Sequence, residues 1–285
     1  MSFFVPFAPH LGFPSIDTPL FRQCVGSADP VRQIAFAAER GLAGVQDPFA
    51  ATRAEDEQVR IGAAIKDHGL RLGCYTYASP DVMMASPWGS GDRAIEERIE
   101  ADVAAAFKIG KRTGASEIAV LSAATSIHSP ERQRDNMERL LRQLGSKASD
   151  EGFTLCLEAV DASRLPWALL HHLADAAEVV RAVASPSVRL VFDTAHVAAM
   201  DGDPNSVLDS VWDLVEVVQI ADVPGRVEIG GGGLALESFI LDVIRRGYGG
   251  LIELEHRWSA PGPTFETSYL KYLASLDERI HLAVM

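Results

Sequence analysis

The sequence predicts a single (β/α)₈ barrel, also called a TIM barrel, that extends over residues 1–285. Short apolar runs alternate with longer amphipathic runs along the chain, and this alternation is completed eight times. A chain of 285 residues is long for one ordinary core, but barrels of this class often exceed about 250 residues in one domain. No linker interrupts the pattern, so we expect one domain.

The expected strands are short runs of β-branched or apolar residues, which is typical of a buried parallel sheet. In chain order they are Phe3–Ala8, Ala43–Gln46, Leu70–Thr76, Glu117–Leu121, Thr154–Glu158, Val188–Phe192, Glu216–Ile220 and Gly250–Leu254.

The expected helices lie after these strands and have recognisable ends. They are Pro30–Arg40, Glu55–His68, Asp92–Thr113, Pro130–Glu151, His171–Ala184, Pro204–Leu214, Leu236–Arg246 and Thr264–Ala283. Ser129 and Asp203 each precede a proline, as an N-cap precedes a proline in the first helical turn. Glycine follows five of the helices, where it favours a left-handed stop; these glycines are Gly41, Gly69, Gly114, Gly152 and Gly247.

An open doubly wound sheet is the main alternative fold, because it also alternates strands and helices. Such a sheet usually carries a glycine fingerprint after its first strand, and this chain has none there. The glycine cluster Gly230–Gly233 lacks the spacing and the lysine of a phosphate-binding loop, which favours a flexible loop after the seventh strand.

Composition excludes several classes of protein. The content of 47% hydrophobic and 23% charged residues is typical of a folded globular chain. A net charge of −13 with scattered basic residues argues against nucleic acid as a partner. No apolar run approaches the roughly 20 residues of a membrane span, and the segment Met1–Phe13 lacks the basic start of a signal peptide. Cys24, Cys74 and Cys156 have no metal-site spacing and suggest buried thiols, so we expect a cytoplasmic protein.

Polar side chains occur at or near the ends of four consecutive expected strands. Glu158, Asp193, Gln219 and Glu255 are separated by 35, 26 and 36 residues, each about one βα unit. Functional residues of a barrel lie at the C-terminal ends of its strands, so these four side chains are expected to converge on the rim. The alternative for any one of them is that it caps a strand or the next helix.

Three carboxylates this close would repel one another unless a cation lies between them. Oxygen ligands favour Mg²⁺ or Mn²⁺, whereas zinc is disfavoured because no Cys or His cluster has its usual spacing. Glu253 shares a strand face with Glu255 and could replace it as a ligand. The predicted metal ligands are Glu158, Asp193, Gln219 and Glu255.

Basic and imidazole side chains also lie near these strand ends. His196 follows Asp193 by three residues and is placed to contact a substrate oxygen or to orient a carboxylate. Arg226 follows the seventh strand and could hold a carboxylate or polarise a carbonyl, unless it is an ordinary surface arginine. His10 and His256 are weaker candidates, because histidines at strand ends are often structural.

Four segments, LCLEAV, VRLVFDTAHVAAMDGD, VEVVQIADVPGR and GYGGLIELEH, carry a family resemblance in their order and spacing. The chain resembles the sugar isomerase/epimerase superfamily of xylose-isomerase-like barrels, and within it most closely hydroxypyruvate isomerase. The resemblance implies Mg²⁺ or Mn²⁺ binding by the four residues named above. It also implies acid/base roles for Glu158 and Glu255, and substrate contacts by His196 and Arg226.

Two departures from the family pattern affect substrate identity. After Arg226 the family usually has a histidine, where this chain has Val227, and a later glutamate is missing from the same loop. Gln46 stands where related proteins often have a glutamate at the end of the second strand.

These residues lead to a hypothesis of metal-dependent proton transfer on a small hydroxy-carbonyl or sugar substrate, by isomerisation or epimerisation. Two glutamates that flank a metal could remove and return a proton next to a carbonyl. One alternative is a lyase or dehydratase of the same superfamily that acts on a keto-sugar or its glycoside. Another is a non-catalytic sugar-binding or partner subunit. A homo-oligomer is compatible with the sequence.

Overall fold

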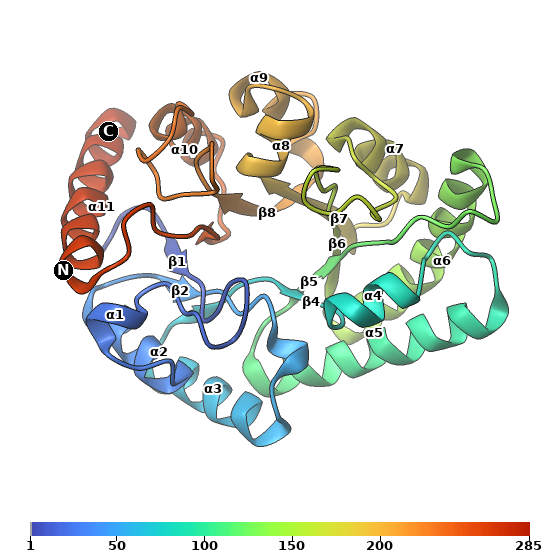
Figure 1. The fold of residues 1–285 in the computed structure, drawn as a ribbon, viewed down its shortest axis with the longest axis horizontal. Coiled ribbons are helices and arrows are strands. Elements are labelled where there is room, and N and C mark those ends of the chain that lie inside the picture. The colour runs from blue at the N-terminus through green and yellow to red at the C-terminus, as the bar shows by residue number, and fades with distance from the viewer. Residues whose placement is uncertain (1) are drawn as a thin grey trace.

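The computed structural model describes residues 2–285, with the strands at the centre and the helices around them (Figure 1). The strands are β1 (Phe7–Pro9), β2 (Gly44–Val45), β3 (Arg71–Leu72), β4 (Tyr75–Thr76), β5 (Glu117–Val120), β6 (Thr154–Leu157), β7 (Val188–Asp193), β8 (Val215–Ile220) and β9 (Ile252–Leu254).

The strands form a curled parallel sheet, in agreement with the predicted barrel. Seven of them pair in the order β1-β9-β8-β7-β6-β5-β4, and β2 pairs with β3. Backbone N–H groups of Ala43 and Gln46 donate to Phe7 and Pro9 and so connect β2 to β1. The expected third strand is present as β3 and β4, which are separated by Gly73 and Cys74. The sheet therefore passes through all eight predicted strand regions.

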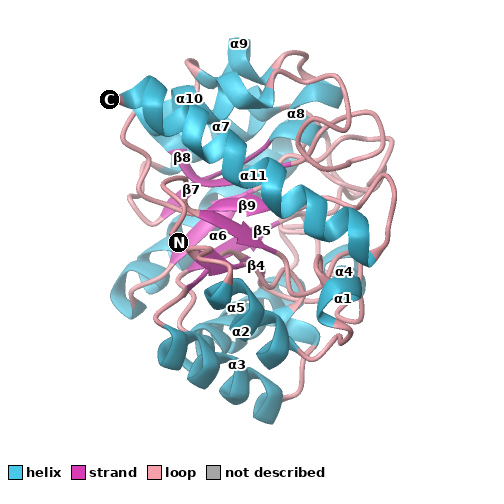
Figure 2. Cartoon of the chain, turned by 90° about the vertical axis from the view of Figure 1, so that its left-hand side faces the viewer, coloured by secondary structure: helices cyan, strands magenta, loops and turns pink. Residues whose placement is uncertain are grey.

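Helices cover the outside of this sheet, as the side view shows (Figure 2). They are α1 (Arg22–Val25), α2 (Pro30–Glu39), α3 (Glu55–His68), α4 (Pro80–Ala85), α5 (Arg93–Thr113), α6 (Pro130–Glu151), α7 (Leu173–Val183), α8 (Thr194–Met200), α9 (Pro204–Leu208), α10 (Leu236–Arg245) and α11 (Pro263–Val284). Short 3₁₀ helices occupy Ala50–Thr52 and Trp212–Leu214.

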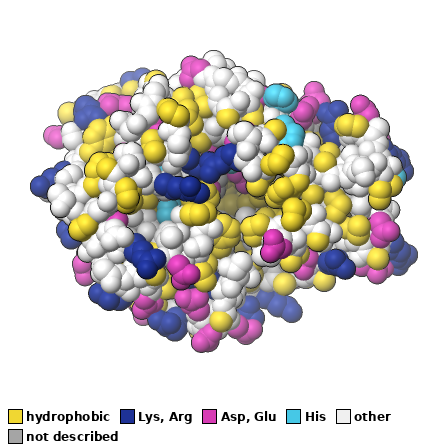
Figure 3. All heavy atoms as spheres, in the orientation of Figure 1, with side chains coloured by type: hydrophobic (Ala, Val, Ile, Leu, Met, Phe, Trp, Pro, Cys, Tyr) yellow, Lys and Arg dark blue, Asp and Glu magenta, His cyan; other side chains and the backbone are white. Residues whose placement is uncertain are grey.

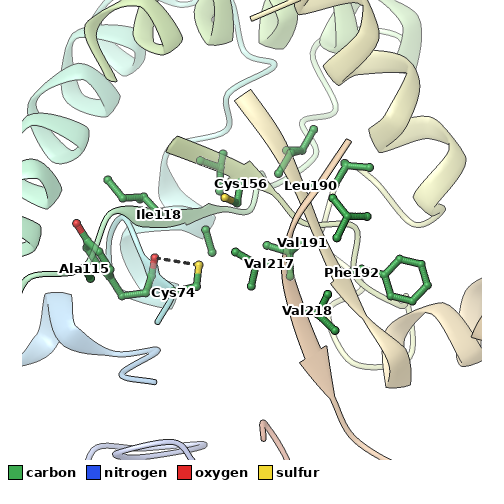
Figure 4. Packing of buried hydrophobic residues seen from close by; sticks show 14 of the residues in the cluster. Cys74, Ala115, Ile118, Cys156, Leu190, Val191, Phe192, Val217 and Val218 are labelled. Atoms are coloured by element: carbon green, nitrogen blue, oxygen red, sulfur yellow. Dashed lines mark hydrogen bonds between the residues drawn. The ribbon is translucent and has the colours of Figure 1, made fainter. Parts of the chain in front are cut away.

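Strand alternation divides the core into two layers. Cys74, Cys156, Val191 and Val217 point into the barrel, whereas Phe192 points outward (Figure 4). The ring of Phe192 stacks on Phe239 of α10 at 5.2 Å. Because side chains two residues apart share a face, Glu158, Asp193 and Gln219 continue the inward-pointing rows of β6, β7 and β8.

The predicted helix starts at Ser129 and Asp203 are present. The Ser129 hydroxyl accepts the N–H of Arg132, and the Asp203 carboxylate accepts the N–H of Asn205. Gly69, Gly114 and Gly152 have positive φ and end α3, α5 and α6 as expected. Caps and stop signals were therefore reliable guides to helix boundaries.

The largest differences from the predicted bounds occur in the first strand and in the helix expected after the sixth strand. The first strand begins at Phe7 rather than Phe3, because Pro6 has no N–H and Asp277 takes the N–H groups of Phe4 and Val5. The helix expected over Pro204–Leu214 ends at Leu208. Just after it, the hydroxyl and the backbone N–H of Ser210 both donate to the carbonyl of Val207. Three short helices, α1, α4 and α8, were not predicted.

No helix within residues 2–285 is long and apolar enough to cross a membrane. The three cysteines are free thiols, and Cys74 and Cys156 are buried, whereas Cys24 is half-buried.

Candidate active site

The four predicted ligands are brought together at the C-terminal end of the barrel. Glu158 follows β6 directly, Asp193 is the last residue of β7, Gln219 lies near the end of β8, and Glu255 follows β9. Asp193 is the register partner of Gln219, and the backbone N–H of Glu255 bonds to Ile220 of β8. Neighbouring strands thus present these side chains to one region of the rim.

A cavity of about 270 Å³ lies above these strand ends. Figure 3 shows a hollow at the middle of this face, with hydrophobic side chains around it and basic side chains at its edge. Its polar lining is Gln46, Thr76, Glu158, Arg164, His196, Gln219, Arg226 and Glu255. Phe13, Phe49, Met83, Leu165 and Trp167 contribute to its apolar walls. The cavity therefore joins a charged floor to apolar sides, which is the usual form of a small-molecule site.

Arg226 links two of the carboxylates. Its guanidinium donates to Asp193 through Nη1 and Nη2 at 3.1 and 2.5 Å, and to Glu255 through Nη2 at 2.6 Å. Residue 226 has a φ of 55°, an uncommon conformation for a side chain other than glycine. Strained backbone of this kind occurs most often at functional sites. Arg226 is thus a buried member of the site and not a surface arginine.

Glu158 has no comparable partner among residues 2–285. Its Oε1 lies 3.9 Å from Nε2 of His196, which is too long for a hydrogen bond. Burial raises the pKa of Glu158 well above its usual value, and the charges of Glu255 and Asp193 raise it further. The carboxyl group of Glu158 is therefore placed for proton transfer or for binding a cation.

Asp193 has two roles in the structure. Its Oδ1 accepts the N–H groups of Ala195 and His196 at 2.9 and 3.0 Å, so it caps α8. Burial acts to raise the pKa of Asp193, but Arg226 and His196 together outweigh burial, and this pKa lies below its usual value. Asp193 therefore caps the helix that follows it, which was the alternative to a functional role. It also belongs to the site, because it binds Arg226.

His196 is fixed by a carboxylate that the sequence did not single out. Its Nδ1 lies 2.8 Å from Oδ2 of Asp161, in the loop after β6. Burial lowers the pKa of His196, despite the neighbouring Asp193 and Asp161. A largely neutral imidazole therefore presents Nε2 toward Glu158. Potential ligand atoms of Glu158, Asp193 and His196 all lie within 4.8 Å of one another.

Gln219 and Glu253 form a pair below the rim. Nε2 of Gln219 donates to Oε2 of Glu253 at 3.1 Å, and Oε1 of Glu253 accepts the N–H of Cys74 at 2.6 Å. Both oxygens of Glu253 are therefore engaged in the barrel interior. This supports the choice of Glu255 over Glu253 as the carboxylate of the rim.

Gln46 belongs to the same network, because its Nε2 donates to Oε2 of Glu255 at 2.6 Å. The position of Gln46 at the end of the second expected strand was the signal in the sequence that could have indicated this role.

His10 and His256 lie next to each other, with Nε2 of His10 at 3.0 Å from the carbonyl of His256. Burial lowers the pKa of His10 to about 4 and that of His256 to about 3. Neither lines the cavity, which agrees with a structural role.

The loop after β8 is held in place by hydrogen bonds to the side chain of Asp222. Gly230 and Gly232 donate their N–H groups to Oδ2 of Asp222 at 3.1 and 3.0 Å, and Leu234 donates to Oδ1 at 2.9 Å. The glycine cluster thus wraps a carboxylate of the chain itself. This agrees with the prediction of a loop without phosphate-binding spacing, but the loop is anchored rather than free.

The donor set fits a hard divalent cation. Glu158, Asp193 and Glu255 bring three carboxylates, and Arg226 brings one guanidinium against them. Oε1 of Gln219 is buried and has no hydrogen-bond partner within residues 2–285. Carboxylate and amide oxygens are the ligands that Mg²⁺ and Mn²⁺ prefer, and one guanidinium does not balance the charge of three carboxylates. The individual ligand assignments stay predictions.

Fold and site together define a (β/α)₈ barrel with an acidic, metal-compatible centre at the C-terminal ends of its strands. The model of one family, the xylose isomerase-like TIM barrel, matches residues 34–276. The chain therefore belongs to the xylose isomerase-like TIM barrel family.

Curated relatives include isomerases and a dehydratase. Hydroxypyruvate isomerase of Escherichia coli (strain K12) is 23% identical over 240 residues, which are 81% of this chain and 89% of the relative. The 3-dehydroshikimate dehydratase of Pseudomonas aeruginosa is 26% identical over 193 residues, which are 61% of this chain. The matched segment spans only 29% of that dehydratase.

Solved structures agree on the fold. An AP endonuclease, family 2, from Brucella melitensis superposes with a TM-score of 0.79 at 20% identity, covering 94% of this chain and 99% of that one. A 3-keto-D-glucoside 4-epimerase from E. coli superposes with a TM-score of 0.73 at 20% identity, covering 95% and 98%. The curated relatives named as hydroxypyruvate isomerases support the view that this chain is an enzyme.

Proposed function

We propose that this protein is a divalent-metal-dependent isomerase or epimerase that moves a proton next to the carbonyl of a small hydroxy-carbonyl compound, with hydroxypyruvate as the first candidate. The observation that carries the proposal is that Glu158, Glu255 and Gln219 line one cavity, that the amide oxygen of Gln219 is unpaired within residues 2–285, and that Arg226 links Glu255 to a third carboxylate, Asp193. Hydroxypyruvate isomerase among the relatives supports the choice of substrate.

Glu158, Asp193, Gln219 and Glu255 would hold Mn²⁺ or Mg²⁺. A divalent cation there supplies positive charge next to the substrate oxygens on which negative charge develops. Glu158 is the candidate base, because its carboxyl group lines the cavity and accepts no hydrogen bond within residues 2–285. Glu255, held by Arg226 and Gln46, is the candidate partner that returns the proton.

His196 and Arg226 would contact the oxygens of the substrate. Nδ1 of His196 is engaged by Asp161, which leaves Nε2 for the cavity. The apolar walls would exclude water from the reacting carbon, which strengthens the charge interactions on the floor. We place the enzyme in the cytoplasm, because its three cysteines are free thiols.

Chelation tests this proposal directly. The purified protein is assayed for bound Mn²⁺ or Mg²⁺, and solvent-deuterium incorporation into hydroxypyruvate is followed before and after chelator treatment. We expect exchange that is lost on chelation and restored by Mn²⁺. Absence of metal binding after reconstitution contradicts the proposal. Metal binding without exchange into hydroxypyruvate or small ketoses favours a non-catalytic binding subunit.

Arg164 is a candidate for binding the carboxylate of the substrate. It lines the cavity beside Leu165 and Trp167, and its guanidinium has no carboxylate partner within residues 2–285. Burial and the nearby charge of Arg226 lower its pKa, so an anion in the cavity would be stabilised there. No sequence signal pointed to this residue beyond its place in the loop after the fifth expected strand.

Replacing Arg164 with methionine is therefore expected to raise KM for hydroxypyruvate about tenfold and to change kcat little, since the lost interaction is a charge-assisted hydrogen bond of substrate binding. Steady-state kinetics with hydroxypyruvate and with neutral dihydroxyacetone measure the effect. Arg164→Lys keeps the charge and is the matched control. An equal rise of KM for both compounds would contradict a carboxylate-specific role.

A dehydratase is the second candidate, and the similarity to 3-dehydroshikimate dehydratase favours it. The same proton abstraction would then be followed by loss of a hydroxyl group from the carbon next to the deprotonated one. Product mass separates the two reactions, because isomerisation conserves mass and dehydration removes one water. Loss of water from hydroxy-carbonyl acids would replace the first proposal with this one.

A further inference from the structure

Glu253 is a fully engaged carboxylate inside the barrel, two residues before Glu255 on the same strand face. Its Oε1 accepts the N–H of Cys74 at 2.6 Å, across the barrel from β9. Its Oε2 accepts from Nε2 of Gln219 at 3.1 Å. Neither the predicted ligand set nor the proposed reaction uses this side chain.

The contact with Glu253 determines which end of the Gln219 amide faces the site. A glutamine amide has an oxygen that only accepts and an NH₂ group that only donates. Glu253 accepts through Oε2, so it selects the NH₂ group and leaves Oε1 of Gln219 turned away from it. That oxygen is buried without a hydrogen-bond partner in the described chain, although Gln219 lines the cavity. An unpaired buried oxygen is costly unless a ligand satisfies it.

The surrounding backbone is adapted to this carboxylate. A Cβ atom at Gly73 would lie 2.2 Å from Oε1 of Glu253, so only glycine leaves room for it. Gly73 and Cys74 lie where β3 and β4 are interrupted, which frees the N–H of Cys74 for Glu253. A glutamine at position 253 could still accept this N–H through its own oxygen. The need for a second acceptor comes from Gln219 alone.

We propose that Glu253 is a positioning residue that fixes the amide of Gln219 so that its oxygen, rather than its NH₂ group, faces the metal site. This inference rests on the proposed function, because it assumes that Gln219 is a ligand. With Glu253→Gln, the oxygen of residue 253 stays on Cys74 and its NH₂ group meets Gln219. Gln219 must then turn its oxygen inward and present NH₂ to the site.

The test compares Glu253→Gln with a double variant that exchanges the two side chains, Gln219→Glu combined with Glu253→Gln. In the double variant, both oxygens of the carboxylate at position 219 can act as acceptors or ligands. One oxygen can accept a hydrogen bond from the amide of residue 253, and the other can bind the metal. Titration with Mn²⁺ alone, without substrate, measures the dissociation constant. We expect Glu253→Gln to weaken Mn²⁺ binding about 10- to 100-fold, and the double variant to return to within a few-fold of the wild type. Glu216→Gln, at the opposite end of β8, is the matched control.

Equal Mn²⁺ affinity of Glu253→Gln and wild type would overturn the inference, and so would a folded double variant that binds as weakly as the single variant. Thermal unfolding reports whether each variant is folded. If Glu253→Gln does not fold, the double variant decides alone, because it must both fold and bind. A wild-type protein that binds no Mn²⁺ defeats the proposed function itself, which separates that failure from failure of the inference.

Discussion

Replacing Glu158 with glutamine is expected to slow solvent-deuterium exchange into the substrate by about 100- to 10,000-fold, which is the contribution of a general base. Glutamine keeps the shape and an oxygen but cannot take up a proton. Exchange rates measured by NMR with saturating Mn²⁺ test the change. Glu255→Gln should cause a similar loss.

The same variant is expected to unfold at a higher temperature than wild type when metal is removed. Burial and then the neighbouring carboxylates raise the pKa of Glu158, so its charged form opposes folding above the ordinary pKa of glutamate, and the neutral amide removes this cost. Glu216→Gln is the control for exchange, because Glu216 lies at the start of β8, at the far end of the barrel. Substantial exchange in both Glu158→Gln and Glu255→Gln would contradict their assignment as acid and base.

Replacing Arg226 with methionine is expected to destabilise the metal-free protein by about 3–5 kcal/mol, because it leaves Asp193 and Glu255 buried without their partner. Exchange should fall strongly as well, since the proposed contact of Arg226 with the substrate is lost. Added Mn²⁺ should raise the unfolding temperature of this variant more than that of wild type, because the cation then compensates the two carboxylates. Calorimetry with and without Mn²⁺ measures both effects.

Arg257→Met is the matched control for Arg226. Both guanidinium groups lie over the ring of Phe13, at 5.1 Å for Arg226 and 5.8 Å for Arg257. Arg257 makes no ion pair with a carboxylate in the part of the chain described, so its loss should change stability by less than about 1 kcal/mol. Similar destabilisation by both variants would show that contact with Phe13, rather than charge, explains the effect of Arg226.

The fold could be predicted from the sequence because its signals are local. Apolar runs, caps such as Ser129 and stop glycines such as Gly152 act within a few residues, and each recurs with the βα unit. Errors arose where a contact distant in sequence decides the outcome. Asp277 takes the backbone N–H groups of Phe4 and Val5, and no pattern near the N-terminus predicts this.

The candidate site divides in the same way. Strand-end position placed Glu158, Asp193, Gln219 and Glu255 on one rim, because strand direction and alternation determine where each side chain points. Several hydrogen bonds of this region could not be predicted, since they join strands that lie far apart in the sequence. The bonds from Gln46 to Glu255 and from Cys74 to Glu253 are of this kind.

The pairing of β1 with β9 has a consequence for how the molecule is made. Phe7 is the register partner of Ile252, which is 245 residues later (252 − 7), so the barrel cannot close until β9 has left the ribosome. Closing a loop of this length is entropically costly and is repaid only when the strands pair. Glu255 follows β9 directly, so the candidate site is completed in the same late step that closes the barrel, and a chain that ends before β9 lacks one of its four predicted ligands.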